Sequence, residues 1–130
     1  PFSDPEGHSF GQSHDEPDEF LFGVDLFNHG YFWEAHEVWE GHWHATGREG
    51  ALADFLKGLI QLAVAGVKVK QDIRDGVVRK AIRAGELFRS ALQSGREVMV
   101  GLRIQSLIRH AIDLSMRPEE GITFQLVIDE

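Results

Sequence analysis

Apolar residues recur along this chain at three- and four-residue intervals, in five segments separated by glycines, prolines and short polar stretches. That spacing places the apolar side chains on one face of an α-helix. The pattern predicts helices over residues 20–27, 31–46, 49–71, 75–94 and 102–116. Because the connections between them are short, the sequence predicts an all-α fold, a bundle or array of five up-and-down helices.

The third predicted helix is apolar on nearly all sides between Phe55 and Val67. A helix of this kind is normally covered by several neighbours or by another subunit. A small domain does not readily cover so much apolar surface. We therefore expect a homodimer.

The two ends of the chain depart from the helical pattern. Residues 1–17 contain three of the four prolines and no apolar periodicity, which predicts a loop or a disordered arm. Residues 118–130 begin with Pro118 and include the run ITFQLVI at 122–128, whose β-branched and aromatic side chains favour an extended tail. The tail either covers the core or pairs across a dimer. The helical domain is predicted between these ends, over residues 18–117.

The composition narrows the class of protein. The sequence has no cysteine, which excludes disulfides, thiolate zinc sites and cysteine nucleophiles. No segment has the pattern of a signal peptide or of a membrane span. We therefore expect a cytoplasmic protein that does not associate with membranes.

The net charge of −8 is unevenly distributed along the chain. Residues 1–54 hold twelve acidic side chains and one basic side chain, Arg48. This distribution argues against nucleic-acid binding, which needs a positively charged face. Only four of the thirteen bases are lysines. Acid excess with few lysines indicates a protein from a salt-rich cytoplasm, and hence a halophilic organism.

The strongest candidate chemistry lies on the second predicted helix. His36 and Glu40 are four residues apart, the spacing at which two side chains meet on a helix face. A projection at roughly 100° per residue places both within an aromatic arc, with Glu40 near its centre. The arc consists of Phe32, Trp33, Trp39 and Trp43. The residues that the projection turns away from the core are Glu34, Val38, Gly41 and His42.

A carboxylate buried in such an arc needs a polar partner. Gln61 is a polar intruder in the apolar third helix, and Asn28 lies in the turn before the second helix. We expect His36, Glu40 and Gln61 to form one buried polar cluster, with Asn28 close to it.

Three interpretations of this cluster remain open. It is a satisfied polar network that sets the register of two helices, in a protein with a structural or interaction role. Alternatively, His36 and Glu40 bind a divalent metal together with Glu37 or His44, since His and carboxylate ligands at these spacings hold zinc or iron in helical bundles. In the third interpretation, His36 and Glu40 form an acid–base pair that acts on an unknown small ligand. The enzymatic alternative is thus a metal-assisted or general acid–base hydrolase.

One motif resembles a known site without matching it. The run HEVWE at residues 36–40 begins like the zinc-protease helix, but Glu40 stands where that motif requires a second histidine. A metalloprotease is therefore not expected.

Two longer motifs resemble a known family. The run FNHGYFWEAHEVWE over residues 27–40, followed by Trp43, and the run FLKGLIQLA over residues 55–63 are similar to the signature of domain of unknown function 309. The likeness is specific over about residues 20–65 and looser to about Ala91. It does not include the N-terminal arm or the C-terminal tail.

The resemblance implies an all-helical fold and no established activity. Members of the family commonly have histidines after the GLIQLA segment, where this chain has Val67 and Lys68. The signature positions carry over to Asn28, Tyr31, Glu34, His36, Glu37, Trp39, Glu40, Trp43, Gly58 and Gln61. Among these, the candidates for binding a ligand are Asn28, Tyr31, Trp39, Trp43 and Gln61.

Overall fold

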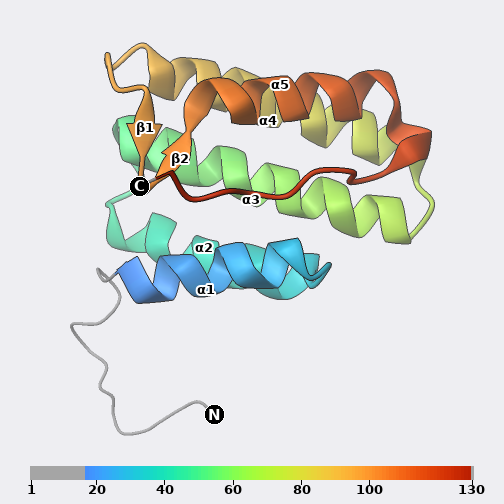
Figure 1. The fold of residues 1–130 in the computed structure, drawn as a ribbon, viewed down its shortest axis with the longest axis horizontal. Helices are drawn as coiled ribbons and strands as arrows, with labels where there is room; N and C mark the ends of the chain where they lie inside the picture. Colours follow the sequence, from blue (N-terminus) through green and yellow to red (C-terminus); the bar gives the residue numbers. More distant parts are fainter. Residues whose placement is uncertain (1–16, 130) are drawn as a thin grey trace, which may run out of the picture.

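The computed structural model describes residues 17–129. The predicted N-terminal arm, apart from its last residue, lies outside the described residues. Five helices follow one another along the chain (Figure 1). Their bounds are α1 (Pro17–Asn28), α2 (Phe32–Ala45), α3 (Ala51–Lys70), α4 (Arg74–Leu92) and α5 (Ile104–Met116). The predicted all-α fold is confirmed, and each helix lies within a few residues of its predicted range.

The helices form an up-and-down array in which each packs mainly against its neighbours in sequence. Figure 1 shows α3 in the middle, with α1 and α2 on one side and α4 and α5 on the other. The buried apolar side chains of all five helices meet in one core. The helices at the two ends of this array are α1 and α5. No described helix is long and apolar enough to cross a membrane.

The central position of α3 explains why its sequence is apolar on nearly all sides. Ten of its twenty residues are buried. Phe55 contacts Phe88 of α4, with ring centroids 6.1 Å apart. On another side, Gly66 lies directly against the ring of Phe32 from α2. Neighbours within the same chain therefore cover α3, and its composition gives no reason to expect a dimer.

A short β-hairpin precedes α5, where the sequence predicted helix from Leu102. Strand β1 (Val98–Met99) pairs antiparallel with β2 (Leu102–Arg103). The two turn residues, Val100 and Gly101, both have positive φ, 47° and 86°. This is the backbone of the tight turn that suits a twisted hairpin. Valine is seldom found in the left-handed region, so this turn was not predicted from the sequence.

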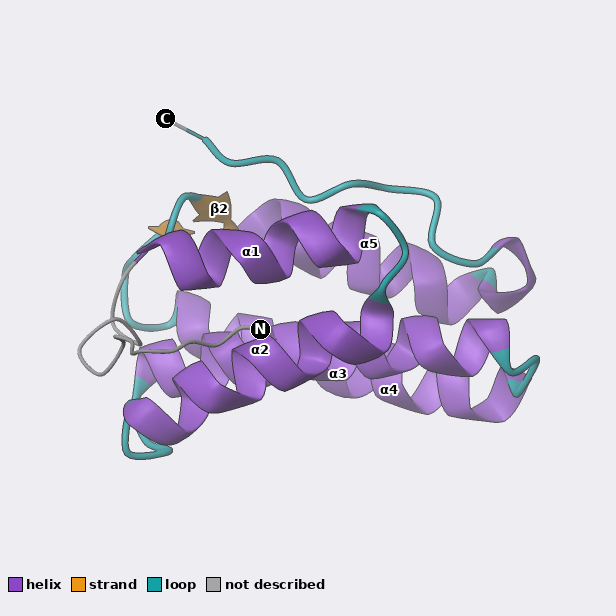
Figure 2. Ribbon diagram, turned by 90° about the horizontal axis from the view of Figure 1, so that it is seen from below, coloured by secondary structure: helices purple, strands orange, loops and turns teal. Residues whose placement is uncertain are grey.

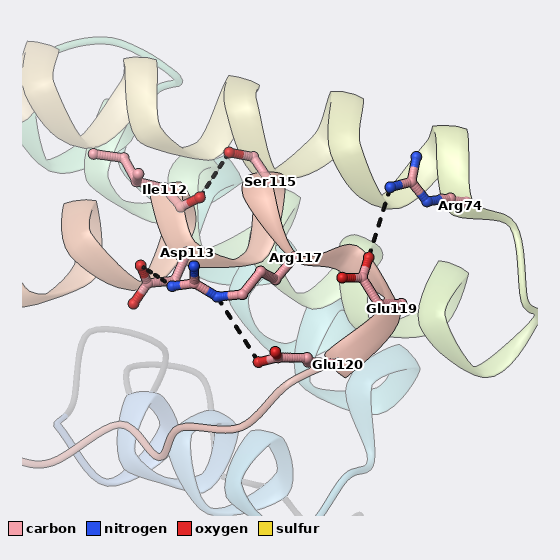
Figure 3. A network of polar contacts seen from close by, with 7 residues as sticks. All are labelled: Arg74, Ile112, Asp113, Ser115, Arg117, Glu119 and Glu120. Atoms are coloured by element: carbon pink, nitrogen blue, oxygen red, sulfur yellow. Dashed lines mark hydrogen bonds and ion pairs between the residues drawn. The ribbon is translucent and has the colours of Figure 1, made fainter.

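A single 3-10 turn, η3 (Pro118–Glu120), joins α5 to the tail. Ion pairs surround it, as Figure 3 shows. Arg117 lies 3.2 Å from Asp113 and 3.9 Å from Glu120, and Arg74 of α4 lies 3.6 Å from Glu119. These side chains are exposed, and exposed ion pairs of this kind contribute little to stability.

The tail, residues 121–129, is extended, as the sequence predicted. Burial alternates along it: the even-numbered residues from 122 to 128 face the protein, and the odd-numbered residues are exposed. Leu126 is the most deeply buried of them. Figure 1 shows the tail running between α5 and α1, in front of α3. In the described chain the tail therefore covers its own core.

Candidate functional site

The outer face of α2 carries most of the residues singled out from the sequence. The buried face of this helix centres on Ala35 and Trp39, both fully buried. Trp33 is 54% exposed. The predicted buried face is therefore wrong, because the prediction placed all three tryptophans of α2 against the core. The true buried face is rotated away from Trp33, and Val38 and His42 are partly buried rather than turned outward.

His36 and Glu40 lie at the edge of this face. The Nε2 atom of His36 is 3.7 Å from Oε1 of Glu40, which confirms that the two side chains are neighbours. However, the Glu40 side chain is 47% exposed and that of His36 is 15% exposed. The prediction that Glu40 is buried is therefore wrong. Its carboxylate needs no buried partner, because water solvates it.

The imidazole of His36 is held in a defined orientation. Its Nδ1 lies 3.1 Å from the carbonyl oxygen of Trp33. A carbonyl only accepts a hydrogen bond, so this contact requires the proton on Nδ1 and leaves Nε2 facing Glu40. The ring also packs on the indole of Trp33, with centroids 4.7 Å apart.

Gln61 does not join this pair. Its Oε1 is buried and receives no hydrogen bond from the described residues. Residues seven apart on a helix share a face, and both such neighbours of Gln61 contact α4. Ser90 of α4 donates to Asp54 at 2.7 Å, and a Cβ built on Gly76 of α4 would lie 3.0 Å from Cδ of Lys68. This side of α3 therefore borders α4, while Lys57, one turn before Gln61, lies over Trp43 of α2. No hydrogen bond among the described residues joins Gln61 to His36 or Glu40, so the expected buried cluster does not form.

The remaining metal-ligand candidates are also separated from one another. Glu37 is exposed. Nδ1 of His44 accepts a hydrogen bond from Nε of Arg48 at 3.1 Å, which occupies a lone pair that a metal would need. Over residues 17–129, no three His, Asp or Glu side chains gather into a group able to hold a metal ion. Metal binding and acid–base chemistry at His36 and Glu40 stay predictions from the sequence.

The other two tryptophans of α2 have different surroundings. The buried indole of Trp39 donates from Nε1 to the carbonyl oxygen of Phe20 at 3.4 Å, so it belongs to the core. Trp43 is half-buried beneath two cations of its own chain. The Nζ atom of Lys57 lies 4.3 Å from its ring centroid, and Cζ of Arg48 lies 5.5 Å away. The Trp39 ring is therefore enclosed in the core, whereas a ligand role for the half-buried Trp43 stays a prediction from the sequence.

Asn28 contacts the C-terminal tail rather than the second helix. Its Nδ2 donates to the carbonyl oxygen of Leu126 at 2.9 Å, and its Oδ1 accepts from the amide of the same residue at 2.8 Å. One side-chain amide thus pairs with both polar groups of one backbone residue, as a neighbouring β-strand would. The sequence marked Asn28 as a binding residue, but it did not identify this partner.

The tail also places one aromatic ring, that of Phe124, between α1 and α5. Phe124 stacks on His110, with ring centroids 4.1 Å apart and planes 4° apart, and its other neighbour is Phe27 at 6.0 Å. Burial under the tail lowers the pKa of His110. The nearby Arg109 adds to this effect, and Asp113 opposes it. His110 was not predicted from the sequence. The alternating apolar pattern of the tail was the available indication, because it implies a surface that the tail packs against.

Comparison with protein families supports the resemblance in sequence. Residues 20–80 match the family model described as a domain of unknown function (DUF309). The match includes Asn28 and the whole of α2 and α3, and it ends near the start of α4. The hairpin, α5 and the tail lie beyond it. A comparison with curated proteins finds none that matches this chain.

Proposed function

We propose that this chain is an interaction module that binds a positively charged segment of a partner protein on the outer face of α2. One observation carries the proposal. Tyr31 and Trp33, 57% and 54% exposed, stand among glutamates on a helix with no lysine or arginine. Large exposed aromatic side chains are unfavourable in water and are enriched at protein interfaces.

The spacing of these residues creates one continuous stripe. Trp33, Glu37 and Glu40 are four and then three residues apart, so their side chains follow one another along the same face of the helix. The imidazole of His36 packs on the indole of Trp33 at an interplanar angle of 47° and restricts the orientation of that ring. A rigid aromatic side chain loses little conformational entropy when a partner binds.

The charge around Trp33 specifies the chemistry of the partner. Among the described residues, Trp43 and Phe32 each have a cation over the ring, Lys57 and Lys70 respectively. No such cation lies over Trp33 within the same part of the chain. A lysine or arginine of a partner would therefore meet both an open indole face and the carboxylates of Glu37 and Glu40, which combines cation–π and ionic attraction.

The proposal is tested with two synthetic amphipathic helices of equal length, one built from lysine and leucine and the other from glutamate and leucine. We expect the basic peptide to shift the indole Nε1–H signal of Trp33 in NMR spectra, and to bind less tightly as salt is added. The acidic peptide should leave that signal unchanged. Equal binding of both peptides would contradict the proposal.

Two variants locate the binding face. Two changes should each lower the affinity for the basic peptide by roughly tenfold, or about 1.4 kcal/mol. They are Trp33→Ala and the double change Glu37→Gln with Glu40→Gln. Ile82→Ala is the matched control, because Ile82 is 49% exposed on α4, away from α2. Equal losses in Trp33→Ala and Ile82→Ala would indicate nonspecific association and overturn the assignment of this face.

A further inference from the structure

The tail lies in a groove whose walls belong to the two end helices of the array. Phe27 and Asn28 of α1 line one side, and Leu107 and His110 of α5 line the other. Figure 2 shows the tail passing alongside α5 and above α1. Since α1 and α5 have little direct contact, the tail is what fills the space between them.

The groove recognises the backbone and the side chains of the tail separately. Asn28 pairs with the amide and the carbonyl of Leu126, which any extended segment offers at that point. The alternate side chains of Phe124 and Leu126 enter the protein, whereas Val127 is 73% exposed. Backbone hydrogen bonds combined with recesses for every second side chain are how proteins bind extended peptides.

The end of the tail fixes its direction and register. The carboxylate of Asp129 lies 2.7 Å from Nη2 of Arg103, and its amide donates to the carbonyl oxygen of Gly101 at 2.6 Å. Both partners belong to the hairpin that precedes α5. An extended segment that entered in the opposite direction would place no carboxylate beside Arg103.

The tail does not fill the groove. A hollow of about 250 Å³ lies between the tail and α5, and a second of about 410 Å³ lies between the tail and the end of α1. The connection of the tail to α5 passes through exposed ion pairs at η3, which hold it weakly. The tail therefore combines one core side chain, Leu126, with the backbone contacts of a bound peptide.

We propose that the groove between α1 and α5 is a receptor site for an extended segment, and that the tail of a second copy of this chain occupies it in exchange for the resident tail. The second copy is the occupant because its tail offers the same two groups to the groove. These are the backbone of Leu126, which pairs with Asn28, and the side-chain carboxylate of Asp129, which pairs with Arg103. The proposal does not depend on the outer face of α2, which is not part of the groove.

The direct test keeps the whole protein. A protease site inserted after Gly121 is cleaved in the folded chain, and a fluorescent peptide with the sequence of residues 122–130 is added. We expect the labelled peptide to replace the cleaved tail in a saturable manner, measured by anisotropy. Peptide with Leu126→Ser should bind roughly tenfold or more weakly, whereas peptide with Val127→Ser should bind like the original.

The substitutions lie in the peptide, so the test remains valid even if the same changes unfold the chain. Equal binding of the Leu126→Ser and Val127→Ser peptides overturns the proposal, as does a failure of any peptide to exchange. In the cleaved chain, Asn28→Ala should weaken the original peptide by about tenfold. Unchanged binding to the Asn28→Ala chain would contradict the role of Asn28 in binding the backbone of the peptide at Leu126.

Exchange between intact chains is measured by sedimentation. A tethered tail competes at an effective concentration of about 1 mM, so concentrated protein is warmed and cooled slowly before analysis. We expect a dimer fraction that increases with concentration, is lost in the Leu126→Ser chain and is retained in the Val127→Ser chain. A chain that exchanges peptide but stays monomeric at every concentration overturns the second copy as the occupant.

Discussion

His110 shows how one side chain couples the stability of the fold to pH. Burial beneath Phe124 lowers its pKa below the ordinary value of 6.5. The unfolded chain therefore takes up a proton at a higher pH than the folded chain does. The contribution of His110 to stability is complete above pH 6.5 and decreases as the pH falls through 6.5 toward the lower, folded pKa.

We predict that His110→Gln reduces the loss of stability on acidification. The unfolding free energy is measured with urea at about pH 7.5 and about pH 5 for both proteins. The difference between them should be a fraction of a kcal/mol, because solvent screens the half-buried ring. His29→Gln, at an exposed position, serves as the control. Identical pH dependence of His110→Gln and the original chain would contradict this role.

At the scale of single residues, the sequence located the important positions better than their partners. It placed His36 beside Glu40, and they are 3.7 Å apart. It also selected Asn28, whose partner Leu126 is 98 residues away. No periodicity links positions so distant in sequence. Gln61 was assigned to the wrong neighbour because its helix is apolar on both sides, and the pattern alone does not say which side faces α2.

Among the helices, two glycines provide a matched test of how closely α3 and α4 approach. A Cβ built on Gly58 of α3 would lie 2.6 Å from Cε1 of the buried Phe88, whereas one built on Gly41 of α2 meets nothing within 4 Å. We predict that Gly58→Ala destabilises the protein by about 1–3 kcal/mol through overpacking. Gly41→Ala should stabilise it by about 0.5–1 kcal/mol, since alanine favours the helix.

Urea unfolding of the three proteins measures both effects as shifts of the midpoint at constant slope. A neutral Gly58→Ala would mean that Phe88 moves aside without loss, and it would remove close packing as the reason for glycine at this position. If Gly41→Ala were also destabilising, the higher helix propensity of alanine would not account for its effect at Gly41.

For whole elements, apolar periodicity was a sufficient guide to where helices lie but not to which face is buried. All five helices follow the pattern closely. On α2, however, the prediction assigned Trp33 to the buried face because it is large and apolar. The small Ala35 is the residue that is fully buried there. The hairpin was missed because its first turn residue, Val100, has a positive φ that valine rarely adopts, although Gly101 at the second position is typical of such a turn.

The charge of the whole molecule leads to a prediction about salt. The chain has a net charge of −8, and three exposed glutamates lie on α2 alone. Repulsion between such charges is screened over about 10 Å at 0.1 M salt and over about 3 Å at 1 M. We predict that raising NaCl over this range increases the unfolding temperature by several degrees. Such a shift corresponds to a gain of roughly 1 kcal/mol in the free energy of unfolding.

Thermal unfolding followed by circular dichroism measures this increase. The combined change of Glu34, Glu37 and Glu40 to glutamine should reduce the gain from salt, because it removes part of the repulsion. An unfolding temperature that does not change with salt would argue against the salt-rich environment that the composition indicates.

The pairing of Asn28 with Leu126 also leads to an expectation about the order in which the chain folds. Helix contacts in the array join neighbours in sequence, which favours rapid formation, whereas this contact joins residues 98 positions apart. We therefore expect the tail to dock last, after the helices have formed its groove. Its amide at Leu126 should exchange hydrogen with solvent through local opening, well before the amides at the centre of α3 become accessible.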